Sequence, residues 1–233
     1  MQATAIQQED LRRLSAEERI AWAVQRFPAS TVASSSFGAD SAVLLHLISR
    51  VAPRLPIVFL NTGFLFAETL GYKTHLEQLL SLNIREVRPA LEREAFLDRH
   101  GPVFRSNPDF CCGCNKVEPM RRALEGVDCW IAGVRADQTA QRAGMSTLER
   151  QADGLHKLHP ILDWDAERMQ EYAQRHRLPP HPLAAEGYRS IGCEPCTAKP
   201  EAGGDARSGR WAGQAKTECG IHYLFEPIHA ATK

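Results

Sequence analysis

The segment Thr31-Val32-Ala33-Ser34-Ser35-Ser36-Phe37-Gly38-Ala39-Asp40-Ser41 decides the fold class. Its first five residues are small or β-branched, which predicts a short buried strand. The small residues from Ser36 to Ser41 predict a loop. Apolar side chains with helical spacing follow the loop: Val43, Leu44, Leu47 and Ile48. The order strand, loop, helix is typical of one unit of a parallel α/β sheet.

Further strands and helices are predicted to alternate along the chain beyond this unit. Predicted strands span 56–60, 84–87, 127–133 and 155–161, and predicted helices span 15–27, 69–82, 116–125 and 165–176. Ser15 and Glu18 fit a capping box at the start of the first helix. This alternation predicts a twisted parallel sheet flanked by helices, which is a Rossmann-like α/β fold. We expect the ligand at the carboxyl ends of the strands, where loops 34–41 and 61–63 fall.

The totals suit one α/β domain with a tail. The chain has 233 residues, 43% of them hydrophobic, and its formal net charge is zero, so no general attraction to nucleic acid or membrane is expected. No apolar run is long enough to cross a bilayer, and the N-terminus lacks the pattern of a signal peptide, so we expect a cytoplasmic protein. We predict an N-terminal helical segment (1–28), a nucleotide-binding domain (29–200) and a mobile Gly/Ala-rich tail (201–233) that acts as a lid.

Seven cysteines, most of them in clusters, indicate a metal centre and a reactive thiol. One group is Cys111-Cys112-Gly113-Cys114, and the other is the Cys193-x-x-Cys196 pair. Two such groups can converge on one centre. Spacing alone leaves open whether Cys112 or Cys114 takes part, and whether the centre is one zinc or an iron–sulfur cluster. Cys129 lies in a predicted apolar strand and is expected in the core.

Basic residues accompany the last cysteine of the chain. Cys219 lies near Lys216 and His222, and positive neighbours favour the nucleophilic thiolate, although Glu218 opposes this effect. We therefore expect Cys219 to be a nucleophile, with an incidental surface cysteine as the alternative. Two arginine pairs could hold sulfate or phosphate oxygens: Arg207 with Arg210, and Arg135 with Arg142. For the second pair a solvated charged surface is an equal alternative.

The loop Ser36–Ser41 suits an oxyanion, because small residues let backbone N–H groups approach it. A Walker A motif is absent from it. The loop resembles the Ser-Gly-Gly-x-Asp-Ser loop of ATP pyrophosphatases, with Phe37 in place of the first glycine. An ordinary strand-to-helix turn is the alternative.

Taken together, these motifs resemble those of the assimilatory adenylylsulfate/phosphoadenylylsulfate reductase family. The resemblance covers residues 34–222, nearly the whole chain. It rests on the motifs Asn61–Thr69, Cys111-Cys112-Gly113 with Lys116–Pro119, Trp130–Arg135, Gly187–Thr197, Arg207-x-x-Arg210-Trp211 and Lys216–His222.

The resemblance implies an adenine nucleotide alpha hydrolase-like fold and reduction of adenosine 5′-phosphosulfate to sulfite and AMP in sulfate assimilation, which serves cysteine biosynthesis. It makes Cys219 the nucleophile. It implies a [4Fe-4S] cluster with ligands Cys111, Cys112, Cys193 and Cys196. It implies these substrate-binding residues: Ser35, Ser36, Phe37, Gly38, Thr62, Gly63, Lys116, Arg135, Arg142, Arg207, Arg210 and His222.

The implied reaction passes through a thiosulfonate on Cys219. A thioredoxin or glutaredoxin-like dithiol protein then releases sulfite. No thioredoxin-like domain follows Cys219, so we expect the dithiol to come from a partner. We hypothesise that the cluster positions Lys116 and tunes the local field without transferring electrons.

Three alternatives stay open at this point. The loop 34–41 also resembles that of phosphoadenylylsulfate (PAPS) reductases, so the 3′-phosphorylated substrate is one alternative. A pyrophosphatase-loop sulfur transferase acting on tRNA and a zinc-stabilised binding module are the others.

Cys114 and Asn115 stand where the family usually has an apolar residue and arginine, and Asn61 replaces the usual aspartate. The sequence also leaves a homo-oligomer open.

Overall fold

A six-stranded sheet forms the centre of the protein. The computed structural model describes residues 8–200, 203 and 205–223. The strand order is β3-β2-β1-β4-β6-β5, and every neighbouring pair is parallel except β5 and β6. The strands are β1 Thr31–Ser34, β2 Pro56–Leu60, β3 Asn83–Val87, β4 Cys129–Ala132, β5 Leu148–Arg150 and β6 His156–Leu158. This confirms the predicted parallel α/β sheet.

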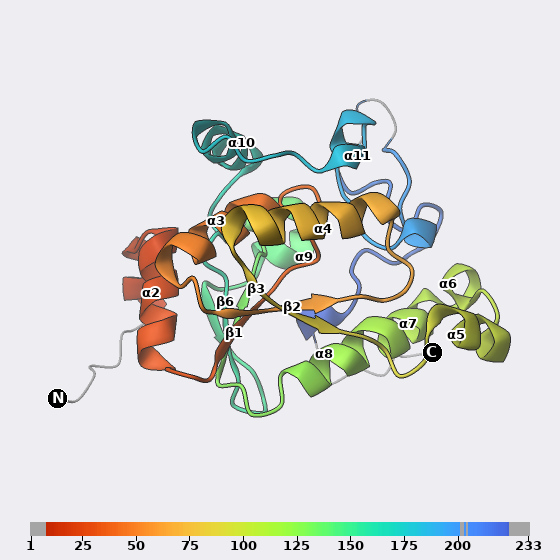
Figure 1. The fold of residues 1–233 in the computed structure, drawn as a ribbon, viewed down its shortest axis with the longest axis horizontal. Coiled ribbons are helices and arrows are strands. Elements are labelled where there is room, and N and C mark those ends of the chain that lie inside the picture. The colour runs from red at the N-terminus through yellow and green to blue at the C-terminus, as the bar shows by residue number, and fades with distance from the viewer. Residues whose placement is uncertain (1–7, 201–202, 204, 224–233) are drawn as a thin grey trace.

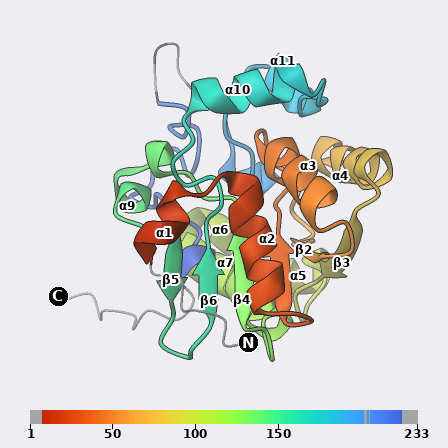
Figure 2. The same cartoon turned by 90° about the vertical axis from the view of Figure 1, so that its left-hand side faces the viewer.

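Helices cover both faces of the sheet (Figure 1). They are α1 Gln8–Arg13, α2 Ala16–Arg26, α3 Ser41–Val51, α4 Ala67–Leu80, α5 Arg93–His100, α6 Val103–Ser106, α7 Pro108–Cys112, α8 Glu118–Ala123, α9 Ala140–Ala143, α10 Ala166–Arg175 and α11 Pro182–Ala185. Helices α3 and α4 lie over one face, and α7 and α8 lie over the other. Figure 2 shows β5, β6 and β4 side by side, with β5 at the edge of the sheet.

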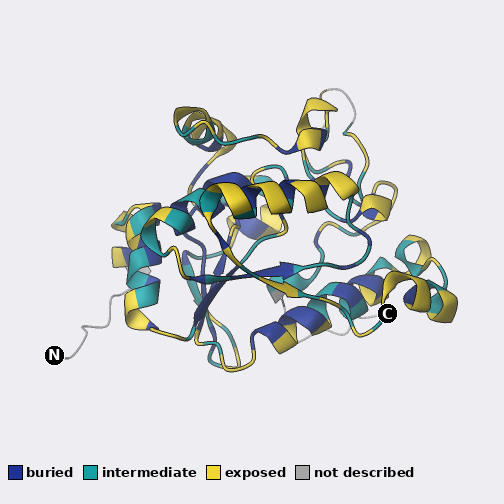
Figure 3. Ribbon diagram, viewed as in Figure 1, coloured by how far each residue is buried: buried dark blue, intermediate teal, exposed yellow. Residues whose placement is uncertain are grey.

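Successive residues of the central strands alternate between two cores, as the two-residue period of a strand requires. Ala33 and Ile131 pack with the helices α2, α3 and α10 on one face. Val32 and Trp130 pack with α8 on the opposite face. Strands β1 and β4 are therefore buried on both sides, whereas β3 at the edge is largely exposed (Figure 3).

The order in which strands are added to the sheet reverses at β1, and the candidate site lies at this position. Strand β1 pairs with β2 on one side and with β4 on the other. The chain runs outward from β1 to β3 and then crosses to β4, which makes the β1–β4 gap the topological switch point where ligands bind in open sheets. The carboxyl ends of both strands meet there, because Ser34 is opposite Ala132.

Helices α7 and α8 join through a π-helical turn, Gly113–Val117. Pro119 has no backbone N–H, so the carbonyl of Asn115 lacks the bond that a regular α-helix would give it. The wider turn accommodates this break, and such turns often occur at functional sites. Here the turn follows Cys111 and Cys112, the last two residues of α7.

Several predicted boundaries agree closely with the structure. Ser15 and Glu18 form the predicted capping box, and the side chain of Asp165 accepts a bond from the Arg168 N–H at the start of α10. Helices α5, α6, α9 and α11 and strand β5 were not predicted from the sequence. The 116–125 helix was also predicted to begin too late, since the helical segment starts at Pro108.

Part of the predicted tail packs on the domain. Trp211 is buried, and the carbonyl of Gly209 accepts a bond of 2.7 Å from the Ala198 N–H. An added Cβ at Gly209 would lie 1.9 Å from the Ala198 oxygen, so only glycine permits this pairing. The rest of the tail, 201–202, 204 and 224–233, and the first seven residues lie outside the described residues. The division into segments 1–28, 29–200 and 201–233 stays a prediction.

None of the described helices is both long and apolar enough to span a lipid bilayer.

Candidate active site

A cavity of about 360 Å³ opens at the carboxyl ends of β1 and β4. Its lining combines the loop after β1, the turn before α8 and the described part of the tail. Most of the substrate and catalytic residues predicted from the sequence line it: Ser35, Ser36, Gly38, Lys116, Arg135, Arg142, Arg207, Arg210, Cys219 and His222. These residues come from segments almost two hundred positions apart, and the fold brings them to one place.

The loop after β1 presents its backbone to the cavity. Phe37 adopts a positive φ of 50°, a conformation that favours glycine. Its ring is fully buried and meets Phe59 edge to face at 5.3 Å, which holds the loop in this shape. The Phe37 side chain therefore belongs to the core rather than to the cavity lining. Ser35 stabilises the turn by accepting a bond of 3.1 Å from the Phe37 N–H.

Thr62 and Gly63, which the sequence analysis placed among the substrate contacts, do not line this cavity. The Thr62 hydroxyl lies 3.3 Å from the Cys193 sulfur and accepts a bond from the Phe64 N–H. Gly63 has a φ of 74°, which suits glycine, and packs against Arg93. In this arrangement the Asn61–Gly63 loop supports the cysteine loop behind the cavity.

Four buried thiols converge beside the cavity. Cys111 and Cys112 end α7, and Cys193 and Cys196 belong to a loop that pairs with Leu65. Cys111, Cys193 and Cys196 share one apolar cluster with Phe64 and Trp211. Burial raises the pKa of the Cys111 thiol to about 11 and that of the Cys112 thiol to about 12.

A metal centre at these four thiols is expected from the sequence. Within the described residues, no three His, Cys, Asp or Glu side chains form a group that could hold a metal ion. Thiolates bound to one tetrahedral zinc would lie about 3.8 Å from one another. In a [4Fe-4S] cluster each thiolate binds a different iron, so the sulfurs stand farther apart. Four cysteine thiols are the donor set that an iron–sulfur cluster takes, and a zinc site can use the same set.

Cys114 and Cys129 lie apart from that set. Cys114 is partly exposed, and burial followed by the charge of Glu118 raises the pKa of its thiol. Cys129 is fully buried in β4, as predicted for a core residue. Asn115, which replaces the family's usual arginine, donates a bond of 3.0 Å to the Cys111 carbonyl and so ties the π-helical turn to α7.

Lys116 connects the thiols with the cavity. Burial lowers the pKa of its ammonium, but the nearby sulfurs of Cys193, Cys219 and Cys112 outweigh burial, and the net shift is upward. The side chain therefore carries a positive charge between the buried cysteines and Cys219. Such a charge favours an anion in the cavity.

The four predicted arginines differ in how many of their N–H groups already have a partner in the protein. Arg135 is held by Asp40 and Asp137, each at 3.0 Å. The Arg210 Nε donates to the Cys196 carbonyl at 3.2 Å, and its guanidinium lies over the Trp211 ring.

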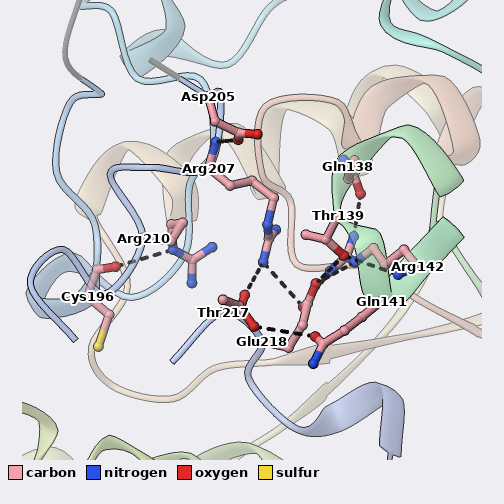
Figure 4. A network of polar contacts seen from close by, with 10 residues as sticks. All are labelled: Gln138, Thr139, Gln141, Arg142, Cys196, Asp205, Arg207, Arg210, Thr217 and Glu218. Atoms are coloured by element: carbon pink, nitrogen blue, oxygen red, sulfur yellow. Dashed lines mark hydrogen bonds and ion pairs between the residues drawn. The ribbon is translucent and has the colours of Figure 1, made fainter. Parts of the chain in front are cut away.

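Arg142 and Arg207 both contact Glu218, as Figure 4 shows. The Arg207 Nε is buried and has no hydrogen-bond partner among the described residues. The arginines therefore face the cavity with different numbers of donors still available to a ligand.

The segment around Cys219 is held on both sides. Before it, the Glu218 carboxylate is buried between the two arginines. After it, the His222 carbonyl accepts a bond of 2.8 Å from Lys157, and the His222 ring stacks on Trp130 at 5.9 Å.

Burial, followed by the charge of Lys157, lowers the pKa of His222 well below its usual value. The ring is therefore neutral at physiological pH. The contact of Lys157 with the site was not predicted from the sequence, although its position in an alternating strand gives it an inward orientation.

The comparisons with known proteins identify the family of this chain. A family model described as the phosphoadenosine phosphosulfate reductase domain matches residues 30–199. An adenosine 5′-phosphosulfate reductase of Mesorhizobium japonicum is 44% identical and covers 82% of this chain and 75% of its own length. One of Mycobacteroides abscessus is 40% identical, with 91% and 90% covered.

A solved structure of a related protein has a similar fold. The crystal structure of a PAPS reductase from Candida auris, a phosphate complex, has a TM-score of 0.72 and 26% identity. The alignment covers 84% of this chain and 100% of that one. The resemblance predicted from the motifs is thereby confirmed, and the protein is an oxidoreductase: the chain belongs to the phosphoadenosine phosphosulfate reductase family.

Proposed function

We propose that the protein reduces adenosine 5′-phosphosulfate to sulfite and AMP, with Cys219 as the nucleophile. The observation that carries the proposal is the convergence of Cys219 with Lys116, Arg207 and Arg210 on one cavity at the switch point of the sheet. The names of the relatives support adenosine 5′-phosphosulfate as substrate. The family supports a reductase over a tRNA sulfur transferase or a zinc-stabilised module.

In the first step the Cys219 thiolate attacks the sulfur of the substrate. A sulfur–sulfur bond forms, the bond from that sulfur to the phosphate oxygen breaks, and AMP leaves with the electron pair. Cys219 is left as a thiosulfonate. Two anions must approach each other in this step. Lys116, Arg207 and Arg210 compensate their charge, and the buried site strengthens that effect.

In the second step an external dithiol reduces the enzyme. One thiolate attacks the Cys219 sulfur and displaces sulfite, which gives a mixed disulfide. The second thiol of the carrier resolves it, so Cys219 returns to the thiol form and the carrier becomes a disulfide. We propose a thioredoxin or glutaredoxin-like protein as the carrier. The cytoplasm keeps such dithiols reduced, which supports a cytoplasmic enzyme.

We propose that Cys111, Cys112, Cys193 and Cys196 hold a [4Fe-4S] cluster. The donor set supports this, because all four thiols are buried, and burial raises the pKa of Cys111, Cys112 and Cys196, so these three gain most from being deprotonated by a metal. When bound, the cluster supplies fixed charge behind the cavity. Lys116 in turn positions the sulfate end of the substrate.

A second candidate substrate is the 3′-phosphorylated nucleotide. The family description, the structural neighbour and the serine-rich loop after β1 favour it. In that case the first and second steps keep the same atoms and electrons, and only the nucleotide contacts differ.

Turnover on the two nucleotides tests the proposal. Sulfite release would be measured with each substrate and with thioredoxin kept reduced. We expect a higher kcat/KM for adenosine 5′-phosphosulfate and no turnover for Cys219→Ser. Cys114→Ser serves as the matched control and should keep activity, since Cys114 lies outside the cavity lining. Turnover by Cys219→Ser would refute the nucleophile, and preference for the 3′-phosphorylated substrate would establish the second candidate.

A further inference from the structure

The carboxylate next to Cys219 is the most completely bound acidic group at the site. The side chain of Glu218 is only 6% exposed. Its Oε1 accepts a bond of 2.8 Å from Arg142 Nε, and its Oε2 accepts one of 2.8 Å from Arg142 Nη2 (Figure 4). Arg207 Nη2 adds a contact of 3.2 Å. Two-point pairing of this kind fixes direction as well as distance.

Every nitrogen of the Arg142 guanidinium already has a protein partner, which leaves at most two of its five N–H groups for a substrate. Its Nε and Nη2 serve Glu218, and its Nη1 donates to Gln138. Arg207 differs, because its Nε is buried with no hydrogen-bond partner among the described residues. The two arginines therefore have separate tasks, although the sequence resemblance assigns both to the substrate.

The neighbouring contacts extend the same interface. Thr139 donates to Glu218 Oε1 at 3.3 Å, and Thr217 donates to Gln141 at 3.3 Å. Residues 217–218 thus meet the short segment 138–142 through several side chains. If Glu218 only occupied the place of the substrate anion, the contact of its neighbour Thr217 with Gln141 would have no role. Cys219 follows Glu218 directly, so its Cα is fixed about 3.8 Å from an anchored residue.

We propose that Arg142 and Glu218 form a latch that docks the catalytic segment over the cavity, and that Arg142 is a positioning residue rather than a substrate contact. The inference rests on the proposed role of Cys219. Arg207 Nε, Arg210 and Lys116 are left to hold the anion. A buried ion pair has its best-attested role in specifying one arrangement over others, which suits a latch.

Alkylation of Cys219 tests the latch without the reaction. Arg142→Met, Glu218→Gln and the double variant would be treated with iodoacetamide without nucleotide, and the Cys219 peptide followed by mass. We expect each single variant to react on the order of tenfold faster, because the segment undocks, and the double variant to add nothing further. Arg50→Met, an exposed arginine on α3, is the control for lost charge and should react at the wild-type rate.

AMP binding separates the latch from a direct contact. Calorimetry should show AMP affinity within about twofold of wild type for Arg142→Met and for Glu218→Gln, while kcat for sulfite release falls. A loss of AMP affinity of about tenfold or more in Arg142→Met would make it a substrate contact and overturn the proposal. Tighter AMP binding in Glu218→Gln would make the carboxylate a substitute for the substrate anion, which also overturns it.

Two further outcomes are decisive. Unchanged alkylation in both single variants would exclude a latch. If Arg142→Met does not fold, Glu218→Gln keeps the side-chain shape and gives both readouts. A protein that fails to reduce either sulfonucleotide, yet shows the expected alkylation pattern, would refute the proposed function and leave the latch in place.

Discussion

Replacing Gly192 by alanine should displace Arg210 without unfolding the protein. An added Cβ at Gly192 would lie 2.3 Å from Arg210 Nη2, 2.6 Å from Cζ and 2.9 Å from Nη1. Ordinary contact begins near 3.4 Å, so the guanidinium must move by about 1 Å. The backbone at Gly192 has no positive φ, and the atoms in the way end a flexible side chain.

A shift of this size is large for a group that stabilises charge. Misplacement by about 1 Å can cost about a hundredfold in rate. That factor corresponds to about 2.7 kcal/mol of transition-state stabilisation. We expect Gly192→Ala to lower kcat/KM about a hundredfold, while thermal unfolding changes by no more than a few degrees.

Steady-state sulfite release measures kcat/KM, and a thermal melt measures stability. Gly71→Ala is the matched control, because its added Cβ meets nothing within 4 Å inside helix α4. It should keep full activity and gain about 0.5–1 kcal/mol of stability. Arg210→Met should lose a similar amount of activity, and the two changes should not add. Wild-type kcat/KM for Gly192→Ala would refute the assigned position of Arg210.

Three further predictions concern other parts of the molecule. Arg19 is buried and binds three backbone carbonyls and Asp163, so Arg19→Met should cost about 3 kcal/mol and lower Tm by about 6–12 °C in a melt; an unchanged Tm would contradict this. When the segment around Cys219 undocks, the pKa of His222 returns to its ordinary value of about 6.5, and below that pH the ring takes up a proton. The equilibrium between docked and undocked forms should therefore shift toward the undocked form by up to about tenfold per pH unit. The rate of Cys219 alkylation, corrected for the fraction of thiolate, should rise as the pH falls. An equal rise in His222→Asn would contradict the assignment of this pH dependence to His222. Cys112→Ser should lose the iron and Cys114→Ser keep it in a metal assay, and the reverse would overturn the ligand choice.

The sheet could be predicted because its central strands are short, apolar and separated by helical patterns. Strand β1 and the loop after it were recognisable from Thr31–Ser41 alone, since β-branched residues give way to small ones. The capping box at Ser15 gave the start of α2. Strand β5 was missed because it has three residues, and its only apolar side chain is Leu148.

The cavity lining was largely predictable, but the division of tasks within it was not. Sequence places Arg142 and Arg207 among basic residues, and it cannot show that Glu218 lies between them. Phe37 and Thr62 illustrate the same limit. Each belongs to a substrate-loop motif, yet the Phe37 ring fills the core and the Thr62 hydroxyl contacts Cys193. Long-range contacts decide such roles, and no local pattern records them.

The most direct measurement is the mass of the Cys219 peptide after the protein has met adenosine 5′-phosphosulfate with no dithiol present. We expect this peptide to gain the mass of one SO₃ group, and we expect added thioredoxin to remove it as sulfite. An unmodified Cys219, or the same group on Cys114 instead, would contradict the assignment of Cys219 as the nucleophile.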